Sequence, residues 1–129
     1  MKIQQSAEDY LETILVLSRK KPQIRSIDIV NELGFSKPSV SVAMKNLREN
    51  GYISMDREGY ITLEEPGQKI AETIYERHTF LTGFLIYLGV SPETAAEDAC
   101  RMEHVISSES FLAMKQFAEK NLKKQDMRK

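Results

Sequence analysis

The sequence predicts a mainly α-helical protein with one small β-hairpin, and two observations lead to this fold class. Apolar residues recur every three to four positions along most of the chain, as they do on the buried face of an α-helix. Between residues 52 and 63 the pattern changes to two short β-type runs, separated by the turn-like segment Asp56-Arg57-Glu58-Gly59. With 41% hydrophobic and 29% charged residues, the 129-residue chain has the composition of a folded protein.

Three helices are predicted before the hairpin, and each has its own start or stop signal. The first begins at Ser6, because Ser6-Ala7-Glu8-Asp9 has the form of a capping box, and it ends before Pro22. The second covers residues 24–33, with Ser26 as its N-cap and Gly34 as its stop.

The third helix is predicted to carry Pro38 in its first turn and to end at Asn50-Gly51. Two short helices joined by a tight turn at Gly34 and followed by a hairpin form the pattern of a winged helix-turn-helix. The outward face of the third helix is basic and rich in small hydroxyl side chains, and Arg57 lies at the hairpin tip. The candidate DNA-binding residues are Ser36, Lys37, Pro38, Ser39, Ser41, Lys45 and Arg57.

Two alternatives to DNA binding remain open from the residues alone. The polar positions could form an ordinary solvated face of a small helical domain. Winged helices also serve as protein-interaction modules, so the pattern is only moderately specific. The order helix, helix, hairpin, together with the serine-rich and basic third helix, favours DNA binding.

The second half of the chain is predicted to be helical throughout. A long helix runs from Pro66 to about Leu88, a second begins at Ser91-Pro92, and a third begins near Ser108. The long helix is apolar around most of its circumference, and so short a chain supplies few elements to cover it. We therefore expect a partner subunit. The predicted domains are residues 1–64, a winged helix-turn-helix, and residues 65–129, an all-helical dimerisation and metal-binding region with a charged, frayed tail from residue 123.

A set of potential metal ligands lies on three of the predicted helices. Cys100, Glu103 and His104 are spaced so that they share one arc of a helix beside its apolar stripe. One further histidine lies on the apolar stripe of the long helix, and two carboxylates project together from the first helix. Thiolate, carboxylate and imidazole are all ligands of transition metals. The candidate ligands are Asp9, Glu12, His78, Cys100, Glu103 and His104.

Each member of this set also has an ordinary structural interpretation. Asp9 could complete the capping box, and Glu12 could be a solvated helix residue. His78 could be a hydrogen-bonded core histidine, and Cys100 a small apolar filler. Glu103-His104 could be an exposed pair. The set favours a metal site more than its members do, because it includes every histidine and the one cysteine of the chain.

Other properties limit the functions to be considered. The net charge is −1, so DNA binding must depend on a local patch. One cysteine excludes an internal disulfide and fits a reducing compartment. No apolar run reaches a membrane span, and the N-terminus lacks a signal-peptide core, so a cytoplasmic location is expected. We find no Gly-rich phosphate loop and no acid–base pair beyond the candidate ligands. An enzyme is therefore not expected, although a metalloenzyme is the third class to weigh.

The sequence resembles the DtxR/MntR family of metal-dependent transcriptional repressors along nearly its whole length. The resemblance is strongest in residues 98–105, a specific motif that follows the predicted winged helix-turn-helix. The motifs that carry it are residues 8–14, 30–33, 36–41, 61–63, Arg77-His78, and Asp98-Ala99-Cys100-Arg101-Met102-Glu103-His104-Val105.

The resemblance implies a homodimer that binds Mn(II) or Fe(II) through the six candidate ligands, with Co(II) or Zn(II) as substitutes. The loaded dimer would bind a palindromic double-stranded DNA operator and repress metal-uptake genes, with no small organic ligand and no membrane partner. The alternative is a metal-independent winged-helix regulator in which Cys100 is a structural or redox residue.

Cys100 departs from the manganese-sensing branch of the family. That branch resembles this chain at Asp9 and Glu12, but it has a glutamate where this chain has Cys100. The iron-sensing branch has a cysteine there. A glutamate can bridge two ions, so its replacement opens the alternative of one ion per subunit. Thr82 and Ala96 stand where the iron branch places further ligands, so that extra site is not expected in its usual form. The chain also ends before an SH3-like third domain, as the shorter manganese sensors do.

Overall fold

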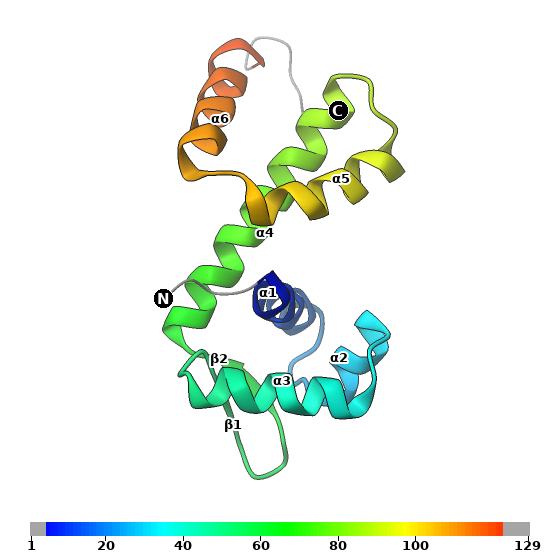
Figure 1. Cartoon of the computed structure of the whole chain (residues 1–129), viewed down its shortest axis with the longest axis vertical. Helices are drawn as coiled ribbons and strands as arrows, with labels where there is room; N and C mark the ends of the chain where they lie inside the picture. Colours follow the sequence, from blue (N-terminus) through cyan, green and yellow to red (C-terminus); the bar gives the residue numbers. More distant parts are fainter. Residues whose placement is uncertain (1–4, 123–129) are drawn as a thin grey trace. The chain divides into compact units, whose positions relative to one another are not determined.

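The computed structural model describes residues 5–122, and in them the predicted fold class is confirmed (Figure 1). The chain divides into two compact units, Met1–Thr73 and Ile74–Lys129, and the helix α4 continues through the division. The predicted tail lies outside the described residues. The elements are α1 Gln5–Lys20, α2 Ser26–Leu33, α3 Lys37–Glu49, β1 Ile53–Met55, β2 Ile61–Leu63, α4 Glu65–Tyr87, α5 Pro92–Val105 and α6 Ser108–Leu122.

The first unit is built on an apolar core to which all three of its short helices and the hairpin contribute. In α1 and α3 the buried residues recur at the three- and four-residue spacing that the sequence predicts. The residues that are no more than 2% exposed are Leu11, Ile14, Ile24, Ile29, Val40, Met44, Ile53 and Ala71. Burial of large apolar side chains at this level is the main force that holds α3 against α1 and α2.

The turn between α2 and α3 follows the predicted signals. Gly34 has φ 73°, and its N–H donates to the carbonyl of Val30 at 2.8 Å, which ends α2. A residue with a Cβ would be strained in this left-handed conformation. Ser36 then caps α3, which has Pro38 in its first turn and ends at Asn50, as predicted.

Two predicted helix starts are wrong by one or two residues. Helix α1 already includes Gln5, so Ser6 lies within its first turn and is not the N-cap. Helix α2 begins at Ser26, and Arg25 in an extended conformation is its N-cap. The Arg25 N–H donates to Asp28 Oδ2 at 2.8 Å. A hydrogen bond from Lys21 holds the pKa of the Asp28 carboxyl below its usual value and strengthens this cap.

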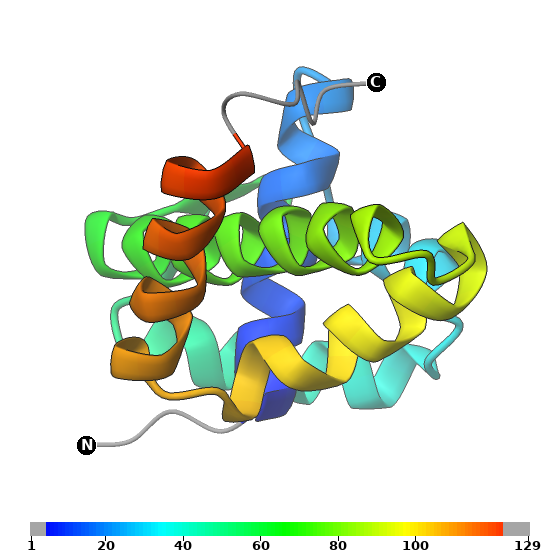
Figure 2. The ribbon, with the colours of Figure 1, turned by 90° about the horizontal axis from the view of Figure 1, so that it is seen from above.

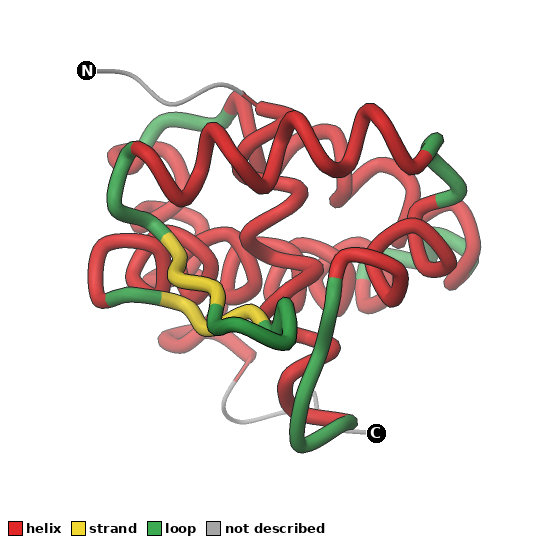
Figure 3. The backbone as a smooth tube through the Cα atoms, turned by 90° about the horizontal axis from the view of Figure 1, so that it is seen from below, coloured by secondary structure: helices red, strands yellow, loops and turns green. Residues whose placement is uncertain are grey.

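The β-hairpin forms where the change of periodicity predicts it. Strands β1 and β2 pair antiparallel, with Ser54 opposite Thr62, and they are the only strands within residues 5–122 (Figure 3). The Asp56 carboxylate accepts the N–H groups of Glu58 at 3.0 Å and Tyr60 at 2.9 Å, which closes the turn. The hairpin tip is therefore held by local hydrogen bonds and carries Arg57 outward.

The second unit comprises the rest of α4 together with α5 and α6 (Figure 2). Ser91 caps α5 as predicted, because its hydroxyl accepts the N–H of Thr94 at 3.3 Å. Phe80 of α4 stacks on Phe84 and meets Phe111 of α6 edge to face. The core residues of this unit are Ile74, Leu81, Ala95, Ala99, Phe111 and Ala118.

Several apolar residues of the second unit, by contrast, are exposed in the single chain. Leu88, Leu112 and Phe117 are 61%, 51% and 57% exposed. Too few elements of the unit are available to cover them. None of the helices in the described part of the chain is long and apolar enough to cross a membrane.

Gly67→Ala is expected to destabilise the first unit. A Cβ at Gly67 would overlap the backbone carbonyl of Tyr52 and would lie 3.3 Å from Leu11 Cδ2. Overpacking of this kind costs about 1–3 kcal/mol, measured as the free energy of unfolding in urea. Gly83→Ala on the same helix is the matched control, since nothing lies within 4 Å of its Cβ position. It should be neutral or stabilising, and an equal loss in both variants would contradict the packing argument.

Candidate DNA-binding surface and metal centre

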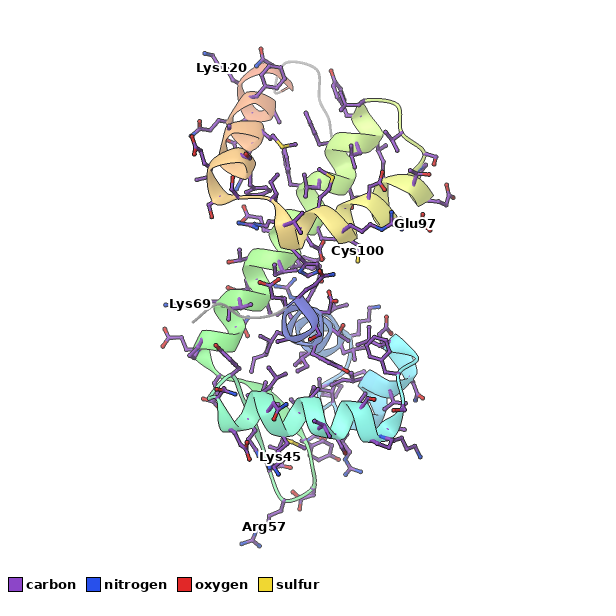
Figure 4. All side chains as sticks on the ribbon, in the orientation of Figure 1. Lys45, Arg57, Lys69, Glu97, Cys100 and Lys120 are labelled. Atoms are coloured by element: carbon purple, nitrogen blue, oxygen red, sulfur yellow. The ribbon has the colours of Figure 1, made fainter. Side chains whose placement is uncertain are left out.

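The outward face of α3 and the hairpin tip form one polar surface of the first unit. Helix α3 buries Val40, Met44 and Leu47, so its remaining side chains turn outward. Figure 4 shows Lys45 and Arg57 projecting at the same end of this unit. Every residue predicted to bind DNA is exposed: Ser36, Lys37, Pro38, Ser39, Ser41, Lys45 and Arg57.

The beginning of α3 is a capped helix N-terminus with exposed polar side chains. The Ser36 hydroxyl accepts the N–H of Ser39 at 3.2 Å and donates to Ser39 Oγ at 2.9 Å. The first turn of a helix carries N–H groups with no intrahelical partner and a partial positive charge. With Lys37 exposed beside it, this turn suits a phosphate oxygen.

Val42 is an exposed α3 residue that the sequence reasoning missed. It is 61% exposed, and its position in the helix is nearly opposite to that of the buried residues Val40 and Met44. The reasoning selected polar and basic side chains, and so it passed over an apolar one. The helical spacing alone was enough to place Val42 on the outward face.

In the second unit, α4 and α5 bring two histidines to one buried carboxylate. Glu103 is 0% exposed, and His78 Nδ1 lies 2.8 Å from its Oε1 atom. On the other side, His104 Nε2 lies 3.4 Å from Glu103 Oε2, and the His104 side chain is 1% exposed. The prediction that Glu103 and His104 could be an exposed pair is therefore wrong.

This cluster has the donor set of a divalent transition-metal site. A buried carboxylate is unfavourable unless it is paired, hydrogen-bonded or bound to a cation. Each Glu103 oxygen faces an imidazole nitrogen, and oxygen and nitrogen donors together suit Mn(II), Fe(II), Co(II) and Zn(II). The residues present in the second unit therefore supply donor types that a metal ion accepts.

The other three candidate ligands lie on α5 and on α1. Cys100 is exposed on α5 (Figure 4), and in the sequence it lies one turn before Glu103 and His104. Asp9 and Glu12 are half-buried on α1 of the first unit. They are three positions apart, a spacing close to one turn of the helix. Their role as ligands stays a prediction.

The chain matches two protein-family models that together cover most of its length. Residues 2–61 match the iron dependent repressor, N-terminal DNA binding domain. Residues 64–126 match the iron dependent repressor, metal binding and dimerisation domain.

Known relatives and solved structures agree with these matches. The transcriptional regulator MntR of Escherichia coli O157:H7 is 39% identical over 88% of this chain and 74% of its own length. An uncharacterized HTH-type regulator, MJ0568 of Methanocaldococcus jannaschii, is 35% identical over 90% of this chain and 94% of its own length.

Among solved structures, the manganese regulator SloR has a TM-score of 0.77 and 27% identity over 92% of this chain. A manganese-dependent transcriptional repressor in complex with manganese has a TM-score of 0.75 and 25% identity over 88% of this chain. The chain spans about half the length of these two structures, 55% and 51%.

Substitutions at Ser36 should separate the stability of α3 from its contact with DNA. Ser36→Asp keeps a good N-cap and should leave the free energy of unfolding unchanged, while its negative charge repels phosphate and weakens DNA binding. Ser36→Ala loses the cap and should lower stability by about 1 kcal/mol. Both are measured by urea unfolding and by fluorescence anisotropy of a labelled duplex at low salt.

The control for these variants is Ser41→Ala, because Ser41 is exposed on the same helix and does not cap it. Its stability should equal that of the wild type. Undiminished DNA affinity in Ser36→Asp would mean that the start of α3 does not lie at the phosphate backbone.

Proposed function

Since this chain belongs to the family of metal-dependent transcriptional repressors, we propose that it binds a palindromic DNA operator as a metal-loaded homodimer and represses metal-uptake genes. The family resemblance inferred from the sequence is confirmed, and with it the presence of a DNA-binding domain and a metal binding and dimerisation domain. The observation that carries the proposal is the fully buried Glu103, held between two histidines within the domain that the family uses for metal.

The proposed ligand set joins this cluster to three further residues. His78, Glu103 and His104 are supported by their geometry. Family resemblance adds Asp9, Glu12 and Cys100. Carboxylate and imidazole favour Mn(II), whereas a thiolate shifts preference toward Fe(II), Co(II) or Zn(II). We therefore propose Mn(II) or Fe(II) as the cofactor, with Co(II) and Zn(II) as substitutes in the laboratory.

When bound, the ion supplies positive charge that offsets the carboxylates of this ligand set. The protein's part is to fix the ligands: His78 orients the Glu103 carboxylate. On α1, Asp9 and Glu12 lie on the same helix as Leu11 and Ile14, which are buried in the core that also holds α3. Restraint of α1 is thus expected to restrain α3, the helix that is proposed to read the DNA (the reading helix).

The homodimer then presents two reading helices to successive major grooves. Half-sites bound in this way are separated by about 34 Å, one turn of the DNA helix, and form a palindrome. We propose that Lys37, Lys45 and Arg57 contact phosphates. Ser39 and Ser41 are small enough for the helix backbone to approach the groove floor, and Val42 suits the apolar methyl group of thymine.

Chelation tests the metal dependence of DNA binding. A duplex is first selected from a random pool with the Mn(II)-loaded protein. Its affinity is then measured by fluorescence anisotropy without oxygen, with Mn(II), Fe(II), Co(II) or Zn(II), and with excess chelator. The chelator should weaken binding roughly 5–150-fold, the usual range of coupling between two sites. His104→Ala should remove this metal response and leave a folded dimer.

Equal affinity with and without chelator would contradict metal dependence and favour the metal-independent winged-helix regulator. An intact metal response in His104→Ala would remove His104 from the ligand set. Dimer formation is checked by sedimentation for each protein, so that loss of assembly is not mistaken for loss of metal binding.

Arg57→Ala should weaken DNA binding by a similar factor on every sequence, because Arg57 at the hairpin tip is proposed to contact phosphate. The slope of log affinity against log salt concentration should fall in magnitude by about 1, the loss of one phosphate contact. Lys120→Ala in α6 removes the same charge from the second unit and is the matched control. If both variants change the slope equally, the effect is one of net charge and Arg57 makes no local contact.

A further inference from the structure

We propose that Arg77 is a positioning residue that fixes the last turn of α5, and thereby holds Glu103 and His104 in place for the metal ion. This inference rests on the proposed function, because it takes Glu103 and His104 as ligands. Arg77 itself is not a ligand, since its guanidinium group stays protonated and has no lone pair to donate.

The Arg77 side chain contacts three successive parts of the chain near the ligands. From α4, its Nη1 donates to the carbonyl of Glu103 at 3.2 Å and to the carbonyl of Ile106 at 2.9 Å. Its Nη2 donates to the hydroxyl of Ser108 at 3.3 Å. The guanidinium carbon also lies 5.5 Å from the centre of the Phe111 ring. One side chain thus joins the end of α5 to the start of α6.

The end of α5 needs such a donor. The carbonyls in the last turn of a helix have no intrahelical N–H partner, and they carry a partial negative charge. Helix α5 ends at Val105, so the carbonyl of Glu103 is a group of this kind, and the carbonyl of the C-cap residue Ile106 follows directly after the helix. The guanidinium fork reaches both carbonyls through Nη1 and Ser108 through Nη2, which a single ammonium nitrogen does less well.

Two consecutive residues of α4 hold the side chain and the backbone of Glu103. His78 contacts the carboxylate at 2.8 Å, and Arg77 holds the backbone carbonyl of the same residue. Rotation of the last turn of α5 would break both interactions. The position of the Glu103 carboxylate, and with it the neighbouring His104, is therefore set by the protein before an ion arrives.

Arg77→Met and Arg77→Lys in the full chain test this inference. Each variant is titrated with Co(II) in the absence of DNA and followed by its visible absorption spectrum, which reports ligand geometry. Loss of an outer partner of a metal site typically lowers metal affinity about 10–100-fold. We expect a loss in this range and an altered spectrum for Arg77→Met, and a smaller loss for Arg77→Lys. Arg101→Met is the control, because Arg101 on α5 is 78% exposed and should leave both readouts unchanged.

Amide hydrogen exchange of the metal-free proteins gives a second readout that does not need metal. Residues 103–108 should exchange faster in Arg77→Lys than in the wild type, while the hairpin should not change. Arg77→Lys therefore carries the test if Arg77→Met does not fold. Wild-type Co(II) affinity and wild-type exchange in a folded Arg77 variant would overturn the inference. A wild-type protein that binds no Co(II) would instead overturn the proposed metal site.

Discussion

The second unit is organised around one unfavourable event, the removal of the Glu103 carboxylate from water. A buried carboxylate is unfavourable unless other groups replace its hydration, and here His78 Nδ1 lies 2.8 Å from Oε1 and His104 Nε2 lies 3.4 Å from Oε2. This requirement fixes which face of α5 meets α4. The same arrangement that makes Glu103 acceptable in the interior also gathers oxygen and nitrogen donors at one point, so packing and metal chemistry have a common origin.

Most of the fold could be predicted because its signals are local. Gly34, Pro38 and the Asp56 turn act through the backbone of their own neighbours, and the structure agrees with each of them. The start of α2 could not be predicted in this way. It depends on the extended backbone of Arg25 and on an acid three residues later, which makes Ser26 the first helical residue although serine is itself a good cap.

The candidate site was predictable to a smaller extent. Helical spacing placed Glu103 and His104 beside the apolar stripe and His78 on the stripe of the preceding helix, and these residues do meet. The same spacing predicted that Cys100 shares their arc of the helix, yet Cys100 is exposed. The arc is wider than the buried face of α5, so a residue at its edge lies in solvent. The contacts of Arg77 span 26 to 31 residues and depend on how the connection after α5 folds, which no local pattern encodes.

The separation of α3 into a buried face and an exposed face has an evolutionary consequence. Its inward residues hold the core of the first unit, whereas Val42 and its polar neighbours on the outward face bury almost nothing. Apart from changes at the N-cap Ser36, mutations on that face are therefore nearly free of a penalty in folding. Under the proposed function, new operator preferences can accumulate there without loss of a stable protein or of the proposed metal dependence. The same separation would let an engineer build mutually independent genetic switches from this one scaffold.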